Sequence, residues 1–391
     1  MNRSILTILA LFAPAALAQD YRLIDLGTFR GESEAFGLNQ AAAAALGYSV
    51  AIDFHYDAAS FVTSPTPLPA QAGFSEHIAT GADAQGRVYG FSYTFGRLDS
   101  SSFMYDGSTL VPLGAFECRD ANAAGELAGT TRVTPGGFVF PRAARWSGGS
   151  LATLPTLGGE SAHAFGIADD SSIVGNSALT SGGAARPCLW INSTPRDLGT
   201  LGGASGEARA RAAEAIVGSS QTAQGAYHAT RWTVAADGSV LSRTDLGALR
   251  PNTTSYAYDI NAAGDIVGSS TFHAVIWQNG AISDLNARIA SAPNWVLNKA
   301  WAIGDSGAIV GRGSYFGVPR AFMLLPCGGQ CCDPDVNCDG AINGFDIEAT
   351  EQAVNGDFTN FCQATADLNG DGAENGFDIE TEEQRVNGAP C

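Results

Sequence analysis

The feature that most constrains this fold is a short glycine-marked element that recurs seven times. It ends in Gly47, Gly90, Gly129, Gly175, Gly218, Gly268 and Gly311, which are spaced 43, 39, 46, 43, 50 and 43 residues apart. Each unit supplies short strand-like segments divided by Gly, Asn, Asp and Ser turns. One such unit cannot bury both faces of its small sheet, so neighbouring units must stack, and this period is typical of four-stranded propeller blades. We therefore predict an all-β, seven-bladed β-propeller over residues 19–326.

Two further columns of residues follow the same period. One is apolar and mostly aromatic, and it comprises Phe61, Phe103, Trp146, Trp190, Trp232, Trp277 and Leu324. The other is Leu-Gly, commonly after Asp, as in Asp25-Leu26-Gly27, Asp197-Leu198-Gly199 and Asp245-Leu246-Gly247. The last unit stops at Pro326 without this segment, and the chain has a spare copy at Tyr21–Gly27. We expect that first segment to be a strand that closes the last blade, which would leave no open sheet edge. A β-helix or an open solenoid is the main alternative, and it would not need the displaced start.

The motifs of residues 20–326 resemble the extracellular HAF-repeat family. The resemblance is carried by His163-Ala164-Phe165, by the Ile-Val-Gly elements, by Asp197–Gly203 and by the spaced tryptophans. It is weaker in the first two units, which lack the His-Ala pair and the Trp. This family implies repeats in exported bacterial proteins and no established chemistry.

The tail from Cys327 differs from the body in charge and in cysteine content. Residues 327–391 hold fourteen acidic side chains and one basic side chain, whereas the whole chain has a net charge of −18. Six of the eight cysteines lie there, namely Cys327, Cys331, Cys332, Cys338, Cys362 and Cys391. We expect them to form disulfides within the tail, with 15 possible connectivities. Cys118 and Cys188 would be either paired or buried thiols. Zinc is the weaker alternative, because the tail has no His.

Two acidic loops in this tail align residue for residue, 32 positions apart. Residues 335–346 and 367–378 both place oxygen-bearing side chains at positions 1, 3, 5 and 12, with Gly at position 6. This is the pattern of an EF-hand-like calcium loop, in which position 7 gives a backbone carbonyl and position 9 an oxygen, direct or through water. The expected ligands are Asp335, Asn337, Asp339, Ala341, Asn343 and Asp346 in the first loop, and Asp367, Asn369, Asp371, Ala373, Asn375 and Asp378 in the second. We therefore predict two Ca²⁺ ions, with short helices at Asp346–Val354 and Asp378–Val386.

Asp at position 12 and a helix only after each loop make residues 327–391 similar to a duplicated dockerin type I module. The resemblance implies calcium ligands at these same loop positions and a cohesin-like domain or cell-surface protein as partner. Two positions that often meet the cohesin are Gly-Phe here, as Gly344-Phe345 and Gly376-Phe377. The six cysteines also depart from the usual pattern.

The first residues are typical of an export signal. Arg3 is followed by an apolar run from Ile5 to Leu17 and by Ala16-Leu17-Ala18, so we expect a signal peptide over residues 1–18 and cleavage before Gln19. The run is shorter than the roughly 20 residues of a membrane-spanning helix, which is the alternative. We expect a secreted or cell-surface protein with no membrane span. Nucleic acid is not expected as a partner, since the chain has no basic patch.

The sequence leaves two classes of function open. The first is a non-catalytic binding or structural propeller, with a glycan or protein ligand, displayed through the calcium module. The second is a propeller enzyme that degrades polysaccharide, a lyase or glycoside hydrolase. We name no catalytic residue, because no nucleophile elbow, phosphate loop or metalloprotease motif is present. Carboxylates, or His with Tyr and Arg, gathered in the central channel would favour the enzyme. We assign structural roles to His163, His228 and His273, such as bonds between blades, and we expect the repeat Asp residues to cap turns.

Overall fold

The computed structural model describes residues 21–28, 32–38, 45–50, 56–61, 65–94, 96, 99–289, 292, 294–326, 334–339, 341–363, 365–369 and 372–387. The predicted signal peptide, residues 1–18, lies outside the described residues. Residues Tyr21–Pro326 form one compact unit, and Cys327–Cys391 belong to another. No helix in the described ranges is long and apolar enough to cross a membrane.

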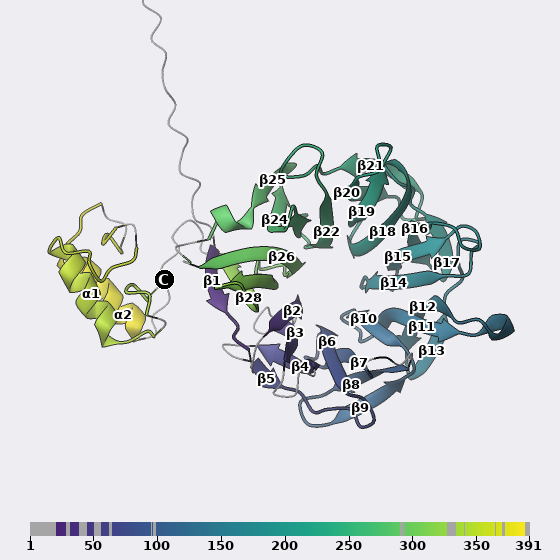
Figure 1. The fold of residues 1–391 in the computed structure, drawn as a ribbon, viewed down its shortest axis with the longest axis horizontal. Helices are drawn as coiled ribbons and strands as arrows, with labels where there is room; N and C mark the ends of the chain where they lie inside the picture. The colour runs from purple at the N-terminus through teal and green to yellow at the C-terminus, as the bar shows by residue number, and fades with distance from the viewer. Residues whose placement is uncertain are drawn as a thin grey trace, which may run out of the picture. The chain divides into compact units, whose positions relative to one another are not determined.

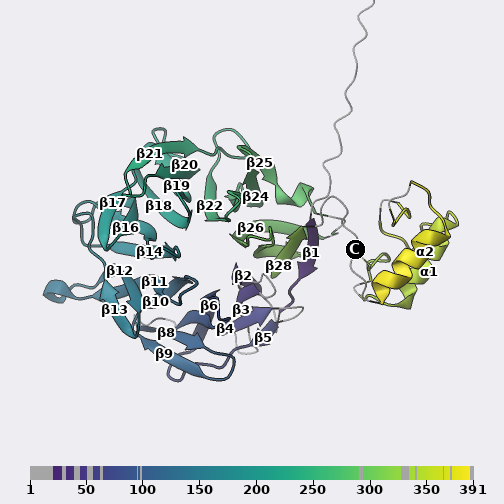
Figure 2. The same cartoon turned by 180° about the vertical axis from the view of Figure 1, so that it is seen from behind.

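The described strands of Tyr21–Pro326 form seven antiparallel sheets of four strands each, arranged around a central axis (Figures 1 and 2). Six sheets follow chain order. They are β2 (Ser33–Leu38), β3 (Ala45–Val50), β4 (Tyr56–Phe61) and β5 (Pro65–Pro67); β6 (Glu76–Ala82), β7 (Val88–Tyr93), β8 (Ser100–Tyr105) and β9 (Leu110–Gly114); β10 (Glu117–Ala121), β11 (Leu127–Val133), β12 (Phe140–Ser147) and β13 (Ser150–Thr153); β14 (Ala162–Ile167), β15 (Ile173–Ala178), β16 (Ala185–Ile191) and β17 (Thr194–Asp197); β18 (Gly202–Ala212), β19 (Ala215–Thr222), β20 (Tyr227–Val234) and β21 (Val240–Asp245); and β22 (Ser255–Ile260), β23 (Ile266–Ser270), β24 (His273–Gln278) and β25 (Ala281–Asp284). The 3₁₀ turns η1 (Pro135–Gly137) and η2 (Leu285–Ala287) lie between strands.

The remaining sheet joins the two ends of this unit. Its order is β1 (Tyr21–Asp25), β28 (Val318–Pro326), β27 (Ile309–Tyr315) and β26 (Trp295–Ile303). β1 pairs antiparallel with β28, from Tyr21 opposite Pro326 to Asp25 opposite Phe322. The Arg320 guanidinium adds an ion pair to the Asp25 carboxylate at 2.7 Å. The first strand of the chain therefore completes the sheet that holds its last three strands.

Each marker glycine lies on the second strand of a different sheet. Gly218 of β19, for example, faces Ala208 of β18, and a Cβ added at Gly218 would lie 2.1 Å from the Glu207 carbonyl oxygen. The facing residue is small and at most 1% exposed in every sheet; the seven are Ala35, Ala79, Cys118, Ala164, Ala208, Ala257 and Ala300. The repeated glycine is thus explained by close approach of two backbones at the inner part of each sheet.

The aromatic column also has a clear role, with one wrong assignment. Trp190, Trp232 and Trp277 are buried, and their indole N–H groups donate to the carbonyls of Pro155, Gly199 and Leu246 at 2.7, 3.0 and 2.9 Å. They are packing residues, as expected. The assignment of Phe103 to this column is wrong. Tyr105 pairs with Val88 as Trp190 pairs with Ile173, whereas Phe103 pairs with Gly90.

The strand expected over Tyr21–Gly27 is shorter than expected, because β1 ends at Asp25. The strands β1, β17, β21 and β25 end at the Asp, because its carboxylate turns back to cap a backbone N–H two residues on. In Asp197 this oxygen accepts the N–H of Gly199 at 2.8 Å. The leucine that follows is then buried, as Leu26 and Leu198 show at 0% exposure. The expected turn-capping role of these Asp residues is confirmed.

The expectation that the repeat histidines bond between blades is wrong for two of the three. His228 pairs with Asp245 at 2.8 Å, and His273 with Asp284 at 2.5 Å, each within one sheet. The reason is that the third and fourth strands of a sheet bring the two columns side by side. Only the Nδ1 of His163, in the first strand β14, reaches another sheet, at 3.4 Å from the Thr130 hydroxyl.

The tail contains two helices, α1 (Gly344–Val354) and α2 (Gly376–Val386), in the described residues (Figure 1). Both begin two residues earlier than predicted. Asn343 and Asn375 are the N-caps, and each forms a reciprocal capping box with the Asp three residues later. A small core joins α1, through Ala349 and Ala353, to Val336, Phe361 and Ala366 of the loops.

Candidate metal centre and central cavity

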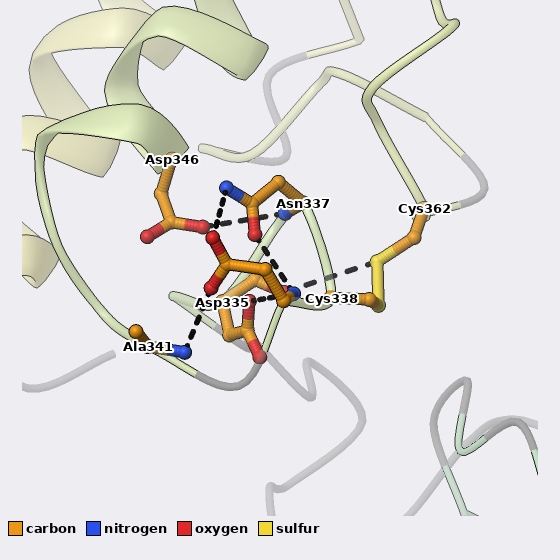
Figure 3. The surroundings of a disulfide bond; sticks show 7 residues. Asp335, Asn337, Cys338, Ala341, Asp346 and Cys362 are labelled. Atoms are coloured by element: carbon orange, nitrogen blue, oxygen red, sulfur yellow. Dashed lines mark hydrogen bonds between the residues drawn. A yellow bond between two sulfur atoms is a disulfide. The ribbon is translucent and has the colours of Figure 1, made fainter.

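The first acidic loop folds its oxygens inward through bonds from its own backbone (Figure 3). The N–H of Asp339 donates to the side-chain oxygens of Asp335 and Asn337 at 3.1 and 2.9 Å. The Asp346 carboxylate closes the loop, accepting the N–H of Asn337 at 3.3 Å and that of Asn343 at 2.9 Å. Backbone hydrogen bonds thus connect the side chains at positions 1, 3, 5 and 12 to this one loop.

The second loop repeats this arrangement where it is described. The Asp378 carboxylate accepts the N–H groups of Asn369 and Asn375 at 3.0 and 2.7 Å. Asp367 accepts the N–H of Gly372 at 2.9 Å. The predicted ligand Asp371 lies outside the described residues.

The position-12 carboxylates are the most constrained groups of each loop. Asp346 and Asp378 are both 0% exposed. An ionised carboxylate is strongly disfavoured in a buried place unless it has hydrogen bonds and an opposite charge. Each Asp346 oxygen accepts one backbone N–H, whereas the Oδ1 of Asp378 accepts two, from Leu368 and Asn369, and its Oδ2 accepts one. A hard cation would use the lone pairs that remain. The donor set of carboxylates, amide oxygens and a carbonyl is the one that Ca²⁺ prefers.

Two observations refine this assignment. Asn343 and Asn375 place their side-chain oxygens on the N–H groups of Phe345 and Phe377, each at 2.9 Å, so these oxygens cap the helices. Position 9 would therefore reach an ion through water, one of the two predicted modes. Among the described residues, no three His, Cys, Asp or Glu side chains are gathered closely enough to hold a metal. The predicted ligand sets of the two loops are mixed, because Asn side chains and backbone carbonyls alternate with the carboxylates.

A disulfide fastens the first loop to the segment that follows α1. Cys338, at loop position 4, bonds Cys362 across 24 residues, with the Cα atoms 6.1 Å apart (Figure 3). A bridge within the tail is thereby confirmed. The other four tail cysteines, Cys327, Cys331, Cys332 and Cys391, lie outside the described residues. Cys118 and Cys188 are buried and not bonded to each other, and burial raises the pKa of the Cys118 thiol to about 12.

The propeller unit holds a central cavity of about 1150 Å³. Six acidic side chains stand in its wall, among them Asp120 and Asp259. Burial raises the pKa of Asp120 to about 6 and that of Asp259 to about 7. Each also joins two sheets, since Asp120 accepts the N–H of Ile167 and Asp259 that of Ile303, both at 2.9 Å.

These carboxyls bear on the question of catalysis. Their second oxygens accept the N–H groups of Ala121 and Ile260, both at 2.8 Å. Every oxygen of the pair is therefore engaged with backbone, as expected of groups that hold neighbouring sheets together. We assign these two residues a structural role.

The Gly304–Gly307 segment is a turn like Asn261–Gly264. The backbone N–H groups of Gly307 and Gly264 donate to the carbonyls of Gly304 and Asn261, at 2.9 and 3.0 Å.

Comparison with known proteins identifies the tail. Residues 333–387 match the model of the dockerin type I domain, and this part of the chain is a dockerin type I domain. Such domains generally bind calcium, pair with cohesins and occur in extracellular or cell-surface proteins. No protein of curated function matches the chain.

Solved structures resemble the propeller only distantly. TolB from Acinetobacter baumannii is 12% identical with a TM-score of 0.40, over 77% of this chain and 65% of its own. A puromycin hydrolase S511A mutant complexed with PGG is 14% identical with a TM-score of 0.47, over 76% of this chain and 51% of its own. AofleA from Arthrobotrys oligospora is 12% identical with a TM-score of 0.37, over 68% of this chain and 89% of its own. The chain thus spans under two thirds of the first two, and the activities of these proteins give no argument about its function.

Proposed function

We propose that this chain is a secreted, non-catalytic binding or structural propeller, anchored by calcium-dependent docking of its tail to a cohesin-like domain. The observation that carries the proposal is the dockerin type I match over residues 333–387. In this proposal residues 1–18 are the export signal, 19–326 the propeller and 327–391 the dockerin module. The HAF-repeat resemblance of residues 20–326 supports export of the body but assigns it no chemistry.

The calcium sites of the proposal are the two acidic loops. Each would hold one ion, with side chains at positions 1, 3, 5 and 12, the carbonyl of Ala341 or Ala373, and water on the position-9 Asn. The ligand pattern shared by the two loops and the buried carboxylates Asp346 and Asp378 support this. The ions would supply positive charge that lets the three-carboxylate loops close and fixes the start of each helix.

The docking surface of the proposal includes the first turn of each helix. Phe345 and Phe377 occupy the same loop position and are 67% and 66% exposed. A large exposed apolar side chain, repeated at equivalent places in a duplicated module, is typical of a protein interface. In other dockerins these loop positions often carry hydroxyl groups, which a polar cohesin surface would bind. Because Phe345 and Phe377 are apolar, we expect the cohesin partner of this chain to have an apolar contact face at this place.

The test measures binding of the full chain to purified type I cohesin domains by surface plasmon resonance, with calcium and with EDTA. We expect binding in calcium alone, at least tenfold weaker for Asp335→Ala with Asp367→Ala. Glu351→Ala, an exposed carboxylate of α1 outside the loops, is the matched control and should bind as the wild type does. Phe345→Ala with Phe377→Ala should weaken docking without changing calcium uptake. Equal binding in EDTA, or no binding to any cohesin in calcium, would refute the proposal.

A further inference from the structure

Every sheet of the propeller has a bulge at the same place in its first strand. The register shifts lie between Ala35 and Gly37 in β2 and at the matching positions of β6, β10, β14, β18, β22 and β26. A bulge leaves one extra residue unpaired and re-aims its side chain. The extra residues are Phe36, Thr80, Arg119, Phe165, Arg209, Tyr258 and Trp301, and all seven line the central cavity.

These positions vary in chemistry while their neighbours do not. The residue before each is the small buried one that faces a marker glycine. Packing thus fixes the neighbour as Ala or Cys, whereas the bulged side chain makes no such repeated contact. A position that the fold holds in place but leaves free in type is suited to ligand recognition.

Three of the seven side chains form a continuous aromatic arc. The Tyr258 and Trp301 ring centroids are 4.3 Å apart, and those of Trp301 and Phe36 are 5.7 Å apart. The Trp301 indole N–H donates to the Glu34 carboxylate at 2.6 Å, which fixes the ring. All three side chains are half-buried, so part of each ring remains open. Rigid, partly open aromatic faces suit a ligand with apolar C–H surfaces.

The two arginines of the set come from other sheets, β10 and β18, on either side of Phe165 in β14. Arg119 pairs with Glu117 at 2.8 Å, and Arg209 pairs with Glu207 at 2.6 Å. The Arg209 guanidinium also lies over the Phe165 ring, 4.2 Å from its centroid. A guanidinium carries five N–H donors, and one carboxylate uses at most some of them. Each pair is therefore close to neutral and still offers donors.

The charge of the cavity argues against ionic ligands. Its wall contains three arginines and six acidic side chains, namely Asp120, Asp169, Asp170, Glu214, Asp259 and Asp305. This excess of acid disfavours an anion. A cation would be repelled by the Arg209 guanidinium over Phe165 and by the Lys299 ammonium, which lies 4.8 Å from the Trp301 ring centroid. A neutral ligand with many hydroxyl groups avoids both the repulsion of an anion and the repulsion of a cation, and it can still accept hydrogen bonds from the arginines.

We propose that the central cavity binds a neutral oligosaccharide, with one sugar ring stacked on Trp301 and Tyr258 and hydroxyl groups held by Arg119 and Arg209. The volume of about 1150 Å³ lies just above the usual range for small-ligand pockets, which ends near about 1,000 Å³, and suits several sugar residues. This inference rests on the proposed binding role of the propeller, and it names the class of ligand.

The experiment is calorimetric titration of the full chain with the hexaoses of cellulose, xylan and mannan, and with trigalacturonate as an acidic probe. Buffers contain EDTA, so docking through the tail plays no part. We expect heat from at least one neutral hexaose and none from trigalacturonate. Trp301→Ala and Tyr258→Ala should each raise Kd at least tenfold, and Trp301→Phe should restore part of the affinity. Phe272→Ala, which removes an aromatic ring that is 86% exposed and not in the cavity wall, should leave Kd unchanged.

Three results would overturn the inference. The first is no heat from any neutral hexaose at 1 mM, a concentration on the order of the weakest useful affinity. The others are tighter binding of trigalacturonate than of the neutral hexaoses, and unchanged affinity in both aromatic variants. Near-ultraviolet circular dichroism checks each fold. If Trp301→Ala loses its native spectrum, Tyr258→Ala carries the test alone, with the same expected loss. Calcium-dependent cohesin docking is measured separately, so failure here leaves that part of the proposed function standing.

Discussion

Replacing a marker glycine by alanine should disrupt its sheet, and Gly90 is a case with a matched control in the same sheet. A Cβ added at Gly90 would lie 2.1 Å from the Ile78 carbonyl oxygen and 3.0 Å from the Ala79 Cα. These are backbone atoms of the neighbouring strand β6, so no side-chain rotation can relieve the overlap. The two strands would have to separate by about 1.4 Å at their inner end, given that non-bonded heavy atoms rest about 3.5 Å apart.

The size of the effect follows from that separation. Overpacking a well-packed interior costs about 1–3 kcal/mol. Loss of one or two ladder hydrogen bonds adds about 1 kcal/mol each. We therefore expect Gly90→Ala to lower the free energy of unfolding by about 4 kcal/mol, or the melting temperature of a unit of this size by about 6 °C.

Gly81 of the same sheet is the matched control. A Cβ there would meet nothing nearer than the Ala121 nitrogen at 3.4 Å, which is ordinary contact. Gly81→Ala should change the stability by less than about 1 kcal/mol. Differential scanning calorimetry of the wild type and both variants makes the comparison. Equal melting temperatures for Gly90→Ala and Gly81→Ala would refute the close-approach explanation of the repeat.

Two further predictions concern pH and the disulfide. Burial raises the pKa of Asp259 in the folded state to about 7, above its ordinary value, so the folded chain holds more protons than the unfolded chain between about pH 4 and 7. The free energy of unfolding should therefore fall as pH rises through this window, by up to about 4 kcal/mol, and the fall should be smaller in Asp259→Asn. Urea unfolding followed by tryptophan fluorescence at pH 4.5, 5.5, 6.5 and 7.5 measures this, and identical slopes in both proteins would contradict it. Replacing Cys338 and Cys362 together by Ser opens a loop of 24 residues and should destabilise the tail by about 3 kcal/mol, seen as faster hydrogen exchange of α1 but not of the propeller strands.

The sequence predicts well those features that a repeated backbone geometry imposes on every unit. The marker glycines are visible because any side chain there would strike the facing strand, as at Gly218. The Asp turns are visible because the same carboxylate cap recurs, as at Asp197. Phe103 is misplaced because an aromatic two residues from the column satisfies the same spacing, and only the pairing of Val88 with Tyr105 separates them.

The residues that line the cavity could not be predicted, because their types do not repeat from sheet to sheet. A bulge shifts the register by one residue, and no residue type marks it: Thr80, Arg119 and Trp301 share a place and nothing else. A search for the position after each small residue that faces a marker glycine would have found them. In the tail, the loop spacing predicts the ligand types, but the capping by Asn343 and Asn375, which starts the helices early, depends on backbone direction at the loop end.

The most direct test of the proposed function is calorimetric titration of the full chain with calcium, because docking and the two-loop assignment both depend on it. The buried position-12 carboxylates and the repeated ligand pattern of both loops predict two ions for the wild type. Asp335→Ala and Asp367→Ala each remove the first ligand of one loop and should each leave one ion. Calcium a hundredfold above Kd should also stabilise the tail by roughly 2.7 kcal/mol. Uptake of two ions, with one lost in each variant, is the predicted result, and absence of calcium uptake by the wild type would contradict the calcium-dependent docking proposed for the tail.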